Sequence, residues 1–580
     1  MSAAPATARA VDIRLAIGLV AALLLAALVL GHYHDRFWWA PDDGADMHMA
    51  ERLLAGEVMH RDIHDVHPGY HNFLNAAALW LFGDDFVSLR YPRVVMGLVQ
   101  AGLLFLLLGP RGAIVGVAGA LGGTALSFVQ FLNPTANWHA LFVYVVIVCA
   151  LAWLPRECRW RLAVLGFLIG TLVMFRQLTG VIVAIGVVAW LLVEPRPGAR
   201  EAGGSRALAR ALVLIMLAGL AGYLLGKTNR QAIGLFGVWP LAVLVWAWFN
   251  LAACNRAVAH MVLWLSAGAI AAAVPLAAYH LANGSVANWL DDVVIGALSL
   301  SQLDFMRADD FGYALFLIYA LRQVAMLVSA AEVVNGLFWI ALLSLATAQG
   351  VLVLRGLMRA GTASPAFHPL PFIGVFYALV AVHFQTPVYL FFSTGPAVAA
   401  LLWLTTGSTG WRRWSPVAFA LALSAVALHY HAAQPLTRGI GGVLRGERVA
   451  LATDHGLDRV SLSIEPDEAA LYAHFVDLIA REAPAGAPIL ALPMNPELYV
   501  LARRRNPLRF FNAGMGLVDA ADVAEALEVL ERDPPALVFH RPRDKYNTPL
   551  TARIVEFVRD RYTPIESIKG FDVYRYRAEN

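Results

Sequence analysis

The sequence contains few charged residues and few cysteines. Asp, Glu, Lys and Arg make up 15% of its 580 residues, and 59% are hydrophobic, whereas soluble domains carry about 25% charged residues. This composition excludes an ordinary soluble protein and indicates a polytopic membrane protein. The three cysteines, Cys149, Cys158 and Cys254, fall in or beside apolar segments, so a disulfide framework and a CxxC-type metal cluster are excluded as well.

A large excess of charge of either sign is also missing. The formal net charge is +3, and the basic residues sit in short loops rather than in one patch. Nucleic acid is therefore excluded as a partner. No internal repeat or low-complexity tract is present.

Apolar runs long enough to cross a membrane recur along most of the chain. A helix of roughly 17–25 residues spans about 30 Å of hydrocarbon. The sequence therefore predicts a mainly α-helical membrane protein with about thirteen transmembrane helices. They are expected near residues 12–31, 92–109, 112–131, 138–154, 161–175, 178–193, 207–225, 233–253, 260–280, 334–354, 370–386, 389–406 and 414–431.

The first apolar run resembles a signal sequence, but it lacks an A-x-A-like cleavage site before the aromatic residues that come after it. We therefore expect it to be an uncleaved first membrane helix. Trp38 and Trp39 would then lie at the membrane interface, where indole rings are enriched.

The basic residues predict the orientation of the chain. Arg111, Arg156, Arg256 and Arg355 fall in alternate loops, and short loops rich in Lys and Arg face the cytoplasm. With thirteen helices the N-terminus is cytoplasmic, whereas the first loop, residues 32–91, and the C-terminal tail are extracytoplasmic. Lys227 and Arg230 are exceptions to this rule, because they fall on the outer side.

The segment 311–333 is ambiguous, because it is apolar enough to span the membrane. Arg322, Gln323 and Glu332 within it, together with the parity of the helices, favour a helix that lies in the interface. If this segment spans, the C-terminal tail moves to the cytoplasm.

The composition changes to that of a soluble protein near residue 455. We therefore expect a transmembrane domain over residues 1–432 and a small extracytoplasmic α/β domain over 455–580. Helical and strand patterns alternate in this tail, with helices at 466–483, 518–532 and 549–562 and strands at 487–493, 536–540 and the closing FDVYRYR. Arg541, Arg543 and Lys545 form a basic run that could meet anionic lipid headgroups, although a solvated surface explains it equally simply.

The segment 42–72 of the first loop is unusually rich in ionisable residues. It holds five aspartates and five histidines, which a lipid-facing chain cannot carry cheaply, so they must lie at a water interface or in a protein-lined cavity. Asp42 and Asp43 could supply the carboxylate base that removes a proton from an attacking hydroxyl in glycosyl transfer. The alternative is that the two aspartates only cap the helix that follows Pro41.

The histidines of this loop raise the possibility of a divalent metal. His48, His64 and His67 are candidate ligands together with one or two carboxylates. His60 and His64 have i,i+4 spacing but lack the HExxH pattern. Loop histidines that respond to pH explain the same residues without a metal. Asp65 and His67 flank a proline-stiffened turn and are candidate substrate-binding residues.

Other polar residues recur at predicted helix ends on the outer side. Arg176 and Gln177 separate two helices, and a guanidinium can bind a phosphate through two hydrogen bonds at once; a snorkelling arginine is the alternative. Amide, imidazole and phenol groups suit a sugar-binding crevice, although they also anchor helix ends. The further candidates of this kind are Arg90, Asn137, His139, His383, Gln385 and Tyr389.

The first loop resembles that of the C-class membrane glycosyltransferases. The similarity is to family 39, the protein O-mannosyltransferases, and to the bacterial aminoarabinose transferases. The matching residues are Asp42-Asp43, the helix from Ala50 to Gly56, Asp65-Val66-His67-Pro68, Phe82-Gly83 and Arg90. Asp43 stands where the family usually has glutamate, Gly69 replaces a second proline, and no lysine follows where several relatives place one on the phosphate.

The resemblance implies an inverting glycosyltransferase of the bacterial inner membrane. Its donor would be a polyprenyl-phosphate-linked sugar, and its acceptor a lipid, glycan or protein. The catalytic base would be Asp42. Because Asp46 is a further acid shortly after the pair, the assignment of the base among Asp42, Asp43 and Asp46 stays open. Arg176 and Gln177 would lie near the lipid phosphate. Two other functions stay open: a transporter or flippase of a polyprenyl-linked or amphipathic substrate, and a non-catalytic family member.

Overall fold

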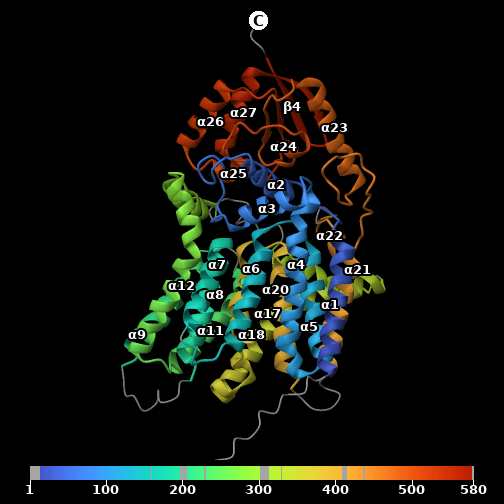
Figure 1. Cartoon of the computed structure of the whole chain (residues 1–580). Coiled ribbons are helices and arrows are strands. Elements are labelled where there is room, and N and C mark those ends of the chain that lie inside the picture. The colour runs from blue at the N-terminus through green and yellow to red at the C-terminus, as the bar shows by residue number, and fades with distance from the viewer. Residues whose placement is uncertain are drawn as a thin grey trace, which may run out of the picture.

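A bundle of long helices carries a small α/β unit at one end (Figure 1). The structure, a computed structural model, describes residues 13–158, 160–195, 205–226, 230–300, 312–327, 329–407, 414–435 and 438–577. Its helices, together with one small sheet, confirm the predicted mainly α-helical membrane protein.

Each of the thirteen predicted segments coincides with an apolar helix of the bundle. These helices are α1 (Ile13–Tyr33), α4 (Tyr91–Leu108), α5 (Ala113–Ala125), α6 (Ala136–Trp153), α7 (Arg161–Phe175), α8 (Gln177–Val193), α9 (Ala207–Leu225), α11 (Val238–Phe249), α12 (Asn255–Ala282), α17 (Ala330–Ala360), α18 (Pro369–Tyr377) with α19 (Val380–His383), α20 (Pro387–Thr405) and α21 (Trp414–Tyr430). Among the described residues, nine helices are long and apolar enough to cross a membrane, and five apolar helices are shorter. The number thirteen stays a prediction.

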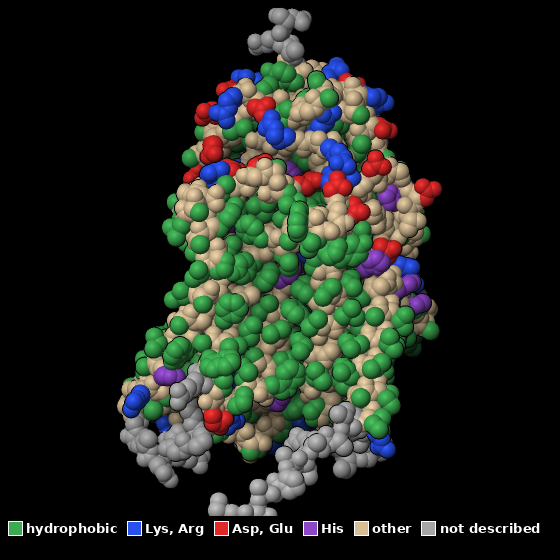
Figure 2. Space-filling model, in the orientation of Figure 1, with side chains coloured by type: hydrophobic (Ala, Val, Ile, Leu, Met, Phe, Trp, Pro, Cys, Tyr) green, Lys and Arg blue, Asp and Glu red, His purple; other side chains and the backbone are tan. Residues whose placement is uncertain are grey.

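The outer surface of the bundle suits a hydrocarbon solvent. Large apolar side chains such as Leu28, Ile215 and Ile270 are exposed on it, and hydrophobic side chains cover the face of the bundle seen in Figure 2. Charged side chains gather over the α/β unit and near the opposite helix ends in the same view. This distribution is that of a membrane-spanning bundle with two aqueous ends.

Small residues allow two helices of the bundle to pack backbone to backbone. A Cβ at Gly166 of α7 would collide with the carbonyl of Leu265 in α12, and one at Gly268 of α12 with the carbonyl of Ala163. Close approach of this kind maximises van der Waals contact, which drives helix association where no hydrophobic effect operates.

The chain between α12 and α17 leaves and re-enters the bundle on one side. The end of α12 lies at the first loop, where the rings of His280 and His60 are 5.3 Å apart. Near the start of α17, Asn335 Nδ2 donates to the carbonyl of Val443, 2.8 Å away, in the chain leading to the tail. The intervening α16 (Tyr313–Met326) has 14 residues, about 21 Å at 1.5 Å per residue, and packs along α17. Residues 301–311 and 328 of this segment lie outside the described residues.

The α/β unit, here called the tail unit, comprises residues 466–576. Its elements are α23 (Pro466–Glu482), β1 (Ile489–Leu492), α24 (Glu497–Leu501), α25 (Ala513–Gly516), α26 (Ala520–Arg532), β2 (Leu537–His540), α27 (Pro549–Arg561), β3 (Tyr562–Ile568) and β4 (Phe571–Tyr576). The sheet order is β1-β2-β4-β3, in which β1 and β2 are parallel and the other two pairs are antiparallel. The predicted helices and strands of the tail thus appear, and the structure adds β3 and the short helices α24 and α25.

The edge strand β3 was absent from the sequence prediction for a physical reason. It contains Pro564 and Glu566, and most of its side chains are exposed or half-buried. An edge strand does not need the alternating apolar pattern by which central strands are recognised, and it tolerates proline.

The first loop lies between the bundle and the tail unit. It forms α2 (Ala40–Leu54) and α3 (Tyr70–Phe82), which Figure 1 shows beneath α24 and α25. The indole ring of Trp38 packs edge-on against Phe86 and against Tyr472 of α23, with ring centroids 5.5 and 5.4 Å apart. Its Nε1 donates to Glu468 Oε2 at 2.9 Å. The prediction that Trp38 lies at the membrane interface is therefore wrong: it is 1% exposed, in a core that the loop and the tail unit share.

This shared core bears on the predicted division of the chain. Backbone hydrogen bonds join Phe37 and Asp35 to Ser463, both at 2.7 Å, and the apolar side chains of the loop and the tail unit form one cluster. The boundaries 1–432 and 455–580 stay a prediction, since the tail unit buries part of its apolar surface against the loop.

Gly44 tests how closely the tail unit must approach α2. A Cβ at this position would collide with the backbone of Glu497 at the start of α24. We expect Gly44→Ala to destabilise the folded protein by about 1–3 kcal/mol, the usual cost of overpacking, and to expose the tail unit to protease. Thermal unfolding and limited proteolysis of the purified protein in detergent measure both effects.

The matched control is Gly31→Ala in α1, where a Cβ would meet nothing within 4 Å. It should change stability by less than about 1 kcal/mol. Equal behaviour of the two variants would contradict the close packing of α2 against α24.

Candidate active site

Asp42 and Asp43 both lie in the first turn of α2 but have different surroundings. Asp43 is fully buried; its Oδ2 accepts from the backbone N–H of Trp39 at 2.8 Å, and its Oδ1 lies 3.3 Å from Nη2 of Arg90. Burial raises the pKa of Asp43, and the Arg90 guanidinium opposes that rise. Asp43 thus stabilises the start of α2, as the capping interpretation proposes.

Arg90 serves the backbone rather than an open crevice. It is 1% exposed. Its guanidinium donates to the carbonyls of His34, Arg36 and Phe37 at 3.2, 3.0 and 2.6 Å, in addition to pairing with Asp43. It therefore holds the end of α1 against the start of α2.

Asp42 is half-buried on the same turn. Burial raises the pKa of its carboxyl to about 6, Lys545 lowers this pKa and Asp43 raises it. Lys545 belongs to the tail unit, in the loop between β2 and α27, and its Nζ lies 5.1 Å from the ring centre of Phe384 and 5.0 Å from that of Tyr546. The tail unit thus contributes a cation that acts electrostatically on Asp42.

A second cation lies at the turn between α7 and α8. Arg176 is 5% exposed, its Nη1 donates to Oδ1 of Asn137, and its guanidinium lies 5.6 Å from the ring centre of Tyr389. Gln177 Nε2 donates to the carbonyl of Val66 at 2.7 Å. The structure therefore brings together Arg176, Asn137 and Tyr389, three residues that the sequence places in turns at one end of the bundle, and ties α8 to the first loop.

Aromatic rings connect the two cations. The rings of Tyr389 and Phe384 are 5.7 Å apart, and those of Tyr389 and His383 are 6.1 Å apart. A series of ring contacts thus runs from Arg176 through Tyr389 and Phe384 to Lys545, and the charge of Lys545 lowers the pKa of Asp42. Gln385 lies in the same turn between α19 and α20.

His139 lies at the start of α6, near this series. Its ring stacks on that of Phe175, the residue just before Arg176, with the ring centroids 4.8 Å apart. This contact places it behind the α7–α8 turn, and the side chain is 1% exposed.

Two further carboxylates lie deeper in the loop. Asn75 Nδ2 donates to Asp46 Oδ1 at 3.1 Å, and burial raises the pKa of Asp46 well above its ordinary value. Asp65 Oδ1 is 2.9 Å from His67 Nδ1, and Asn72 Nδ2 donates to Asp65 Oδ2 at 2.7 Å. Burial alone would raise the pKa of Asp65, but the His67 imidazole holds it below its usual range.

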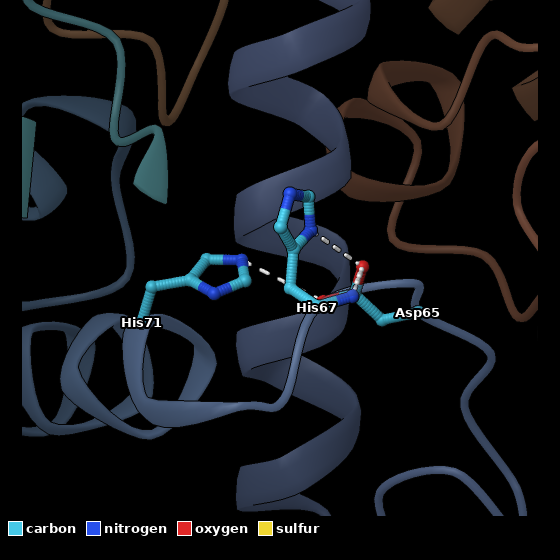
Figure 3. A group of neighbouring side chains, drawn as sticks. All are labelled: Asp65, His67 and His71. Atoms are coloured by element: carbon cyan, nitrogen blue, oxygen red, sulfur yellow. Dashed lines mark hydrogen bonds and ion pairs between the residues drawn. The ribbon is translucent and has the colours of Figure 1, made fainter. Parts of the chain in front are cut away.

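The candidate metal ligands fall into different surroundings. Asp65, His67 and His71 offer ligand atoms that lie within 4.8 Å of one another, and Figure 3 shows the three side chains grouped where the loop enters α3. His48 instead stacks on Tyr499 of the tail unit at 4.8 Å. His64 Nε2 lies 3.7 Å from Asp292. Of the three histidines proposed from the sequence, His67 alone belongs to this group.

A cavity of about 800 Å³ lies elsewhere on the same side of the bundle, lined by Tyr33, Arg36, Gln434, Arg448 and Asp454 among others. It contains neither Asp42 nor Arg176. The chemistry of the side chains, rather than the size of a cavity, therefore locates the candidate site.

Lys545 is the residue of this site that sequence reasoning missed. By its sequence the basic run 541–545 indicates only a solvated surface or a lipid contact, and it lies about 500 residues from Asp42. No local pattern signals such a contact, because it depends on how the tail unit docks on α2.

The fold and the site define a polytopic membrane protein with carboxylates and cations gathered where its bundle meets a small α/β unit. No family model and no curated protein matches the sequence. Among solved structures, the chain is similar to ArnT from Cupriavidus metallidurans bound to undecaprenyl phosphate, with 13% identity, a TM-score of 0.39 and coverage of 97% of this chain and 98% of that chain.

The apo state of the same ArnT is similar at 14% identity, with a TM-score of 0.39 and 97% of each chain covered.

The buried pair of Asp43 and Arg90 provides a test of the site's framework. Because removing one partner leaves a buried charge unpaired, we expect Asp43→Asn to destabilise the folded protein by about 3–5 kcal/mol. Thermal unfolding in detergent would measure the loss.

The exposed pair of Arg503 and Asp84, 3.2 Å apart, is the control. Arg503→Ala should cost no more than about 1 kcal/mol, the range of surface ion pairs. If Asp43→Asn were as stable as Arg503→Ala, Asp43 would not hold the start of α2.

Proposed function

We propose that this protein is an inverting glycosyltransferase that moves a sugar from a polyprenyl-phosphate-linked donor to a lipid, glycan or protein acceptor. The observation that carries the proposal is the half-buried carboxylate of Asp42 with the cation of Lys545 beside it, joined through aromatic rings to Arg176. The first loop and the tail unit face the extracytoplasmic side of a bacterial inner membrane in this proposal, and the N-terminus lies in the cytoplasm.

Asp42 acts as the general base. Its carboxylate takes the proton from the acceptor hydroxyl while the hydroxyl oxygen attacks the anomeric carbon of the sugar. The bond between this carbon and the phosphate oxygen breaks, its electron pair stays on the polyprenyl phosphate, and the configuration inverts. A phosphate leaves without protonation, so one carboxylate is enough, whereas inverting glycosidases use two.

Arg176 and Lys545 bind the phosphate of the donor. A guanidinium donates two hydrogen bonds to phosphate oxygens, and an ammonium adds a second positive charge where negative charge develops. The first loop contains no lysine, and Lys545 of the tail unit supplies the ammonium. The rings of Phe384 and Tyr389 between the two cations offer an apolar and phenolic surface for the sugar or for the first isoprene units.

The surroundings of the other two aspartates favour Asp42 as the base. Asp43 is engaged by Arg90 and by the backbone of Trp39. Asp46 is buried and bonded to Asn75. Asp42 is the member of the three that combines partial exposure with a pKa of about 6, which suits a base at neutral pH.

A replacement series of the three aspartates tests this assignment. We expect Asp42→Asn to lower the rate by about 10²–10⁴-fold, the usual contribution of a general base, while thermal stabilisation by polyprenyl phosphate is retained. The measurement is the release of free polyprenyl phosphate by the purified protein from polyprenyl-phosphate hexoses and pentoses.

Two comparisons test the alternatives, namely Asp46 as the base and a transporter function. If Asp42→Asn keeps its activity and Asp46→Asn loses it, the base is Asp46. If the wild-type protein releases no polyprenyl phosphate from any donor but moves a polyprenyl-linked substrate across liposomes, it is a transporter and not a transferase.

The pH dependence of the rate tests the electrostatic role of Lys545. The base is active when deprotonated, so the rate should rise with pH through about 6, the pKa of Asp42, and then level off. Lys545 lowers that pKa, so Lys545→Ala should raise it and shift the acid limb of the pH–rate profile to higher pH. Lys545→Arg should keep the limb in place.

Arg543→Ala is the control for this profile. Arg543 is exposed on the same loop and is not among the groups that shift the pKa of Asp42. The electrostatic effect of Lys545 on Asp42 is contradicted if the acid limb of the pH–rate profile stays in place in Lys545→Ala. It is also contradicted if the limb moves equally in Arg543→Ala.

A further inference from the structure

The turn 65–71 brings an aspartate and two histidines to one point. Asp65 and His67 lie before Pro68 and Gly69 in this turn, and His71 lies in the first helical turn of α3. Gly69 between them has φ +128°, a conformation that side-chain-bearing residues rarely adopt. This glycine reverses the chain so that His71 comes back beside Asp65, as Figure 3 shows.

His71 lies between two carboxylates without a hydrogen bond to either. Its Nε2 is 3.6 Å from Asp65 Oδ2 and 3.7 Å from Asp46 Oδ1, whereas N–H···O bonds fall at about 2.7–3.2 Å. Two ligands held at about 2.1 Å from a tetrahedral Zn²⁺ are about 3.4 Å apart. The separations of His71 from the two carboxylates therefore suit ligands around a shared cation better than hydrogen bonds, whereas His67 Nδ1 lies at hydrogen-bond distance, 2.9 Å, from Asp65 Oδ1.

Burial makes an arrangement without a cation expensive. His71, Asp65 and Asp46 are 2%, 5% and 7% exposed. Two buried carboxylates near the same imidazole nitrogen repel each other, and a divalent cation between them removes the repulsion.

The surrounding side chains orient the carboxylates as outer partners of a metal site do. Asn72 Nδ2 donates to Asp65 Oδ2 at 2.7 Å, and Asn75 Nδ2 donates to Asp46 Oδ1 at 3.1 Å. Hydrogen bonds of this kind fix ligand geometry and are typical of metal centres. The side chain of His67 is 32% exposed, which leaves a route for an ion from solvent.

We propose that Asp65, His67 and His71, with Asp46 as a fourth oxygen ligand, bind one divalent transition-metal ion of the Zn²⁺ class. Two imidazoles and two carboxylates select such an ion over Mg²⁺ and Ca²⁺, which prefer oxygen ligands alone. The ion clamps the start of α3 to α2 and so holds the loop that carries Asp42. The inference does not depend on the transfer reaction.

The test is metal binding by the full-length protein in detergent. After the protein is stripped with a chelator, titration with Zn²⁺ should give one tightly bound ion per chain, and Co²⁺ should give the visible absorption bands of a low-symmetry site. We expect His67→Ala and His71→Gln each to weaken Zn²⁺ binding by about 100-fold or more. The half-exposed His67 keeps the test valid if His71→Gln fails to fold.

The control is His32→Ala, an exposed histidine at the end of α1 on the same side of the bundle, which should leave the bound ion in place. The proposal is overturned if the wild-type protein binds no stoichiometric Zn²⁺, or if His67→Ala binds it as tightly as His32→Ala. Because the readout is the bound ion, such a failure leaves the Asp42 series to decide the proposed transfer reaction.

Discussion

The cost of keeping ionisable side chains next to hydrocarbon governs the arrangement of this protein. The segment 42–72 carries ten aspartates and histidines, and an unpaired charge cannot remain stable beside lipid. The chain meets this constraint by placing the segment between the bundle and the tail unit and by giving its buried carboxylates partners: Arg90 for Asp43, Asn75 for Asp46, and His67 with Asn72 for Asp65.

The same constraint separates the roles of two neighbouring aspartates. Asp43 points into the protein, where an arginine that also holds three backbone carbonyls keeps it fixed. Asp42 is only half-buried, and the charge of Lys545 lowers the pKa of its carboxyl. One residue stabilises the loop and its neighbour stays available for chemistry, although the sequence presents them as an equivalent pair.

The tail unit has two roles in this arrangement. It completes the core around Trp38, so the first loop is a buried element rather than an extended surface loop. It also supplies Lys545 to the site. The site is therefore incomplete without the tail unit, which packs against α2 so closely that a Cβ at Gly44 would collide with the backbone of Glu497.

The sequence by itself determined the helices of the bundle, because twenty apolar residues in a row have few other structures available in a membrane. It also determined the polar loop and the α/β pattern of the tail, and the parity of the helices predicts that the turns carrying Asn137, Arg176 and Tyr389 share one side of the membrane; that the three side chains meet there follows from helix packing. The tertiary structure alone decided the burial of Trp38, the pairing of Asp43 with Arg90, the grouping of His71 with Asp65, and the approach of Lys545 to Asp42. These contacts arise from how the loop folds back on itself and from how the tail unit docks on it, and neither follows from the pattern of nearby residues.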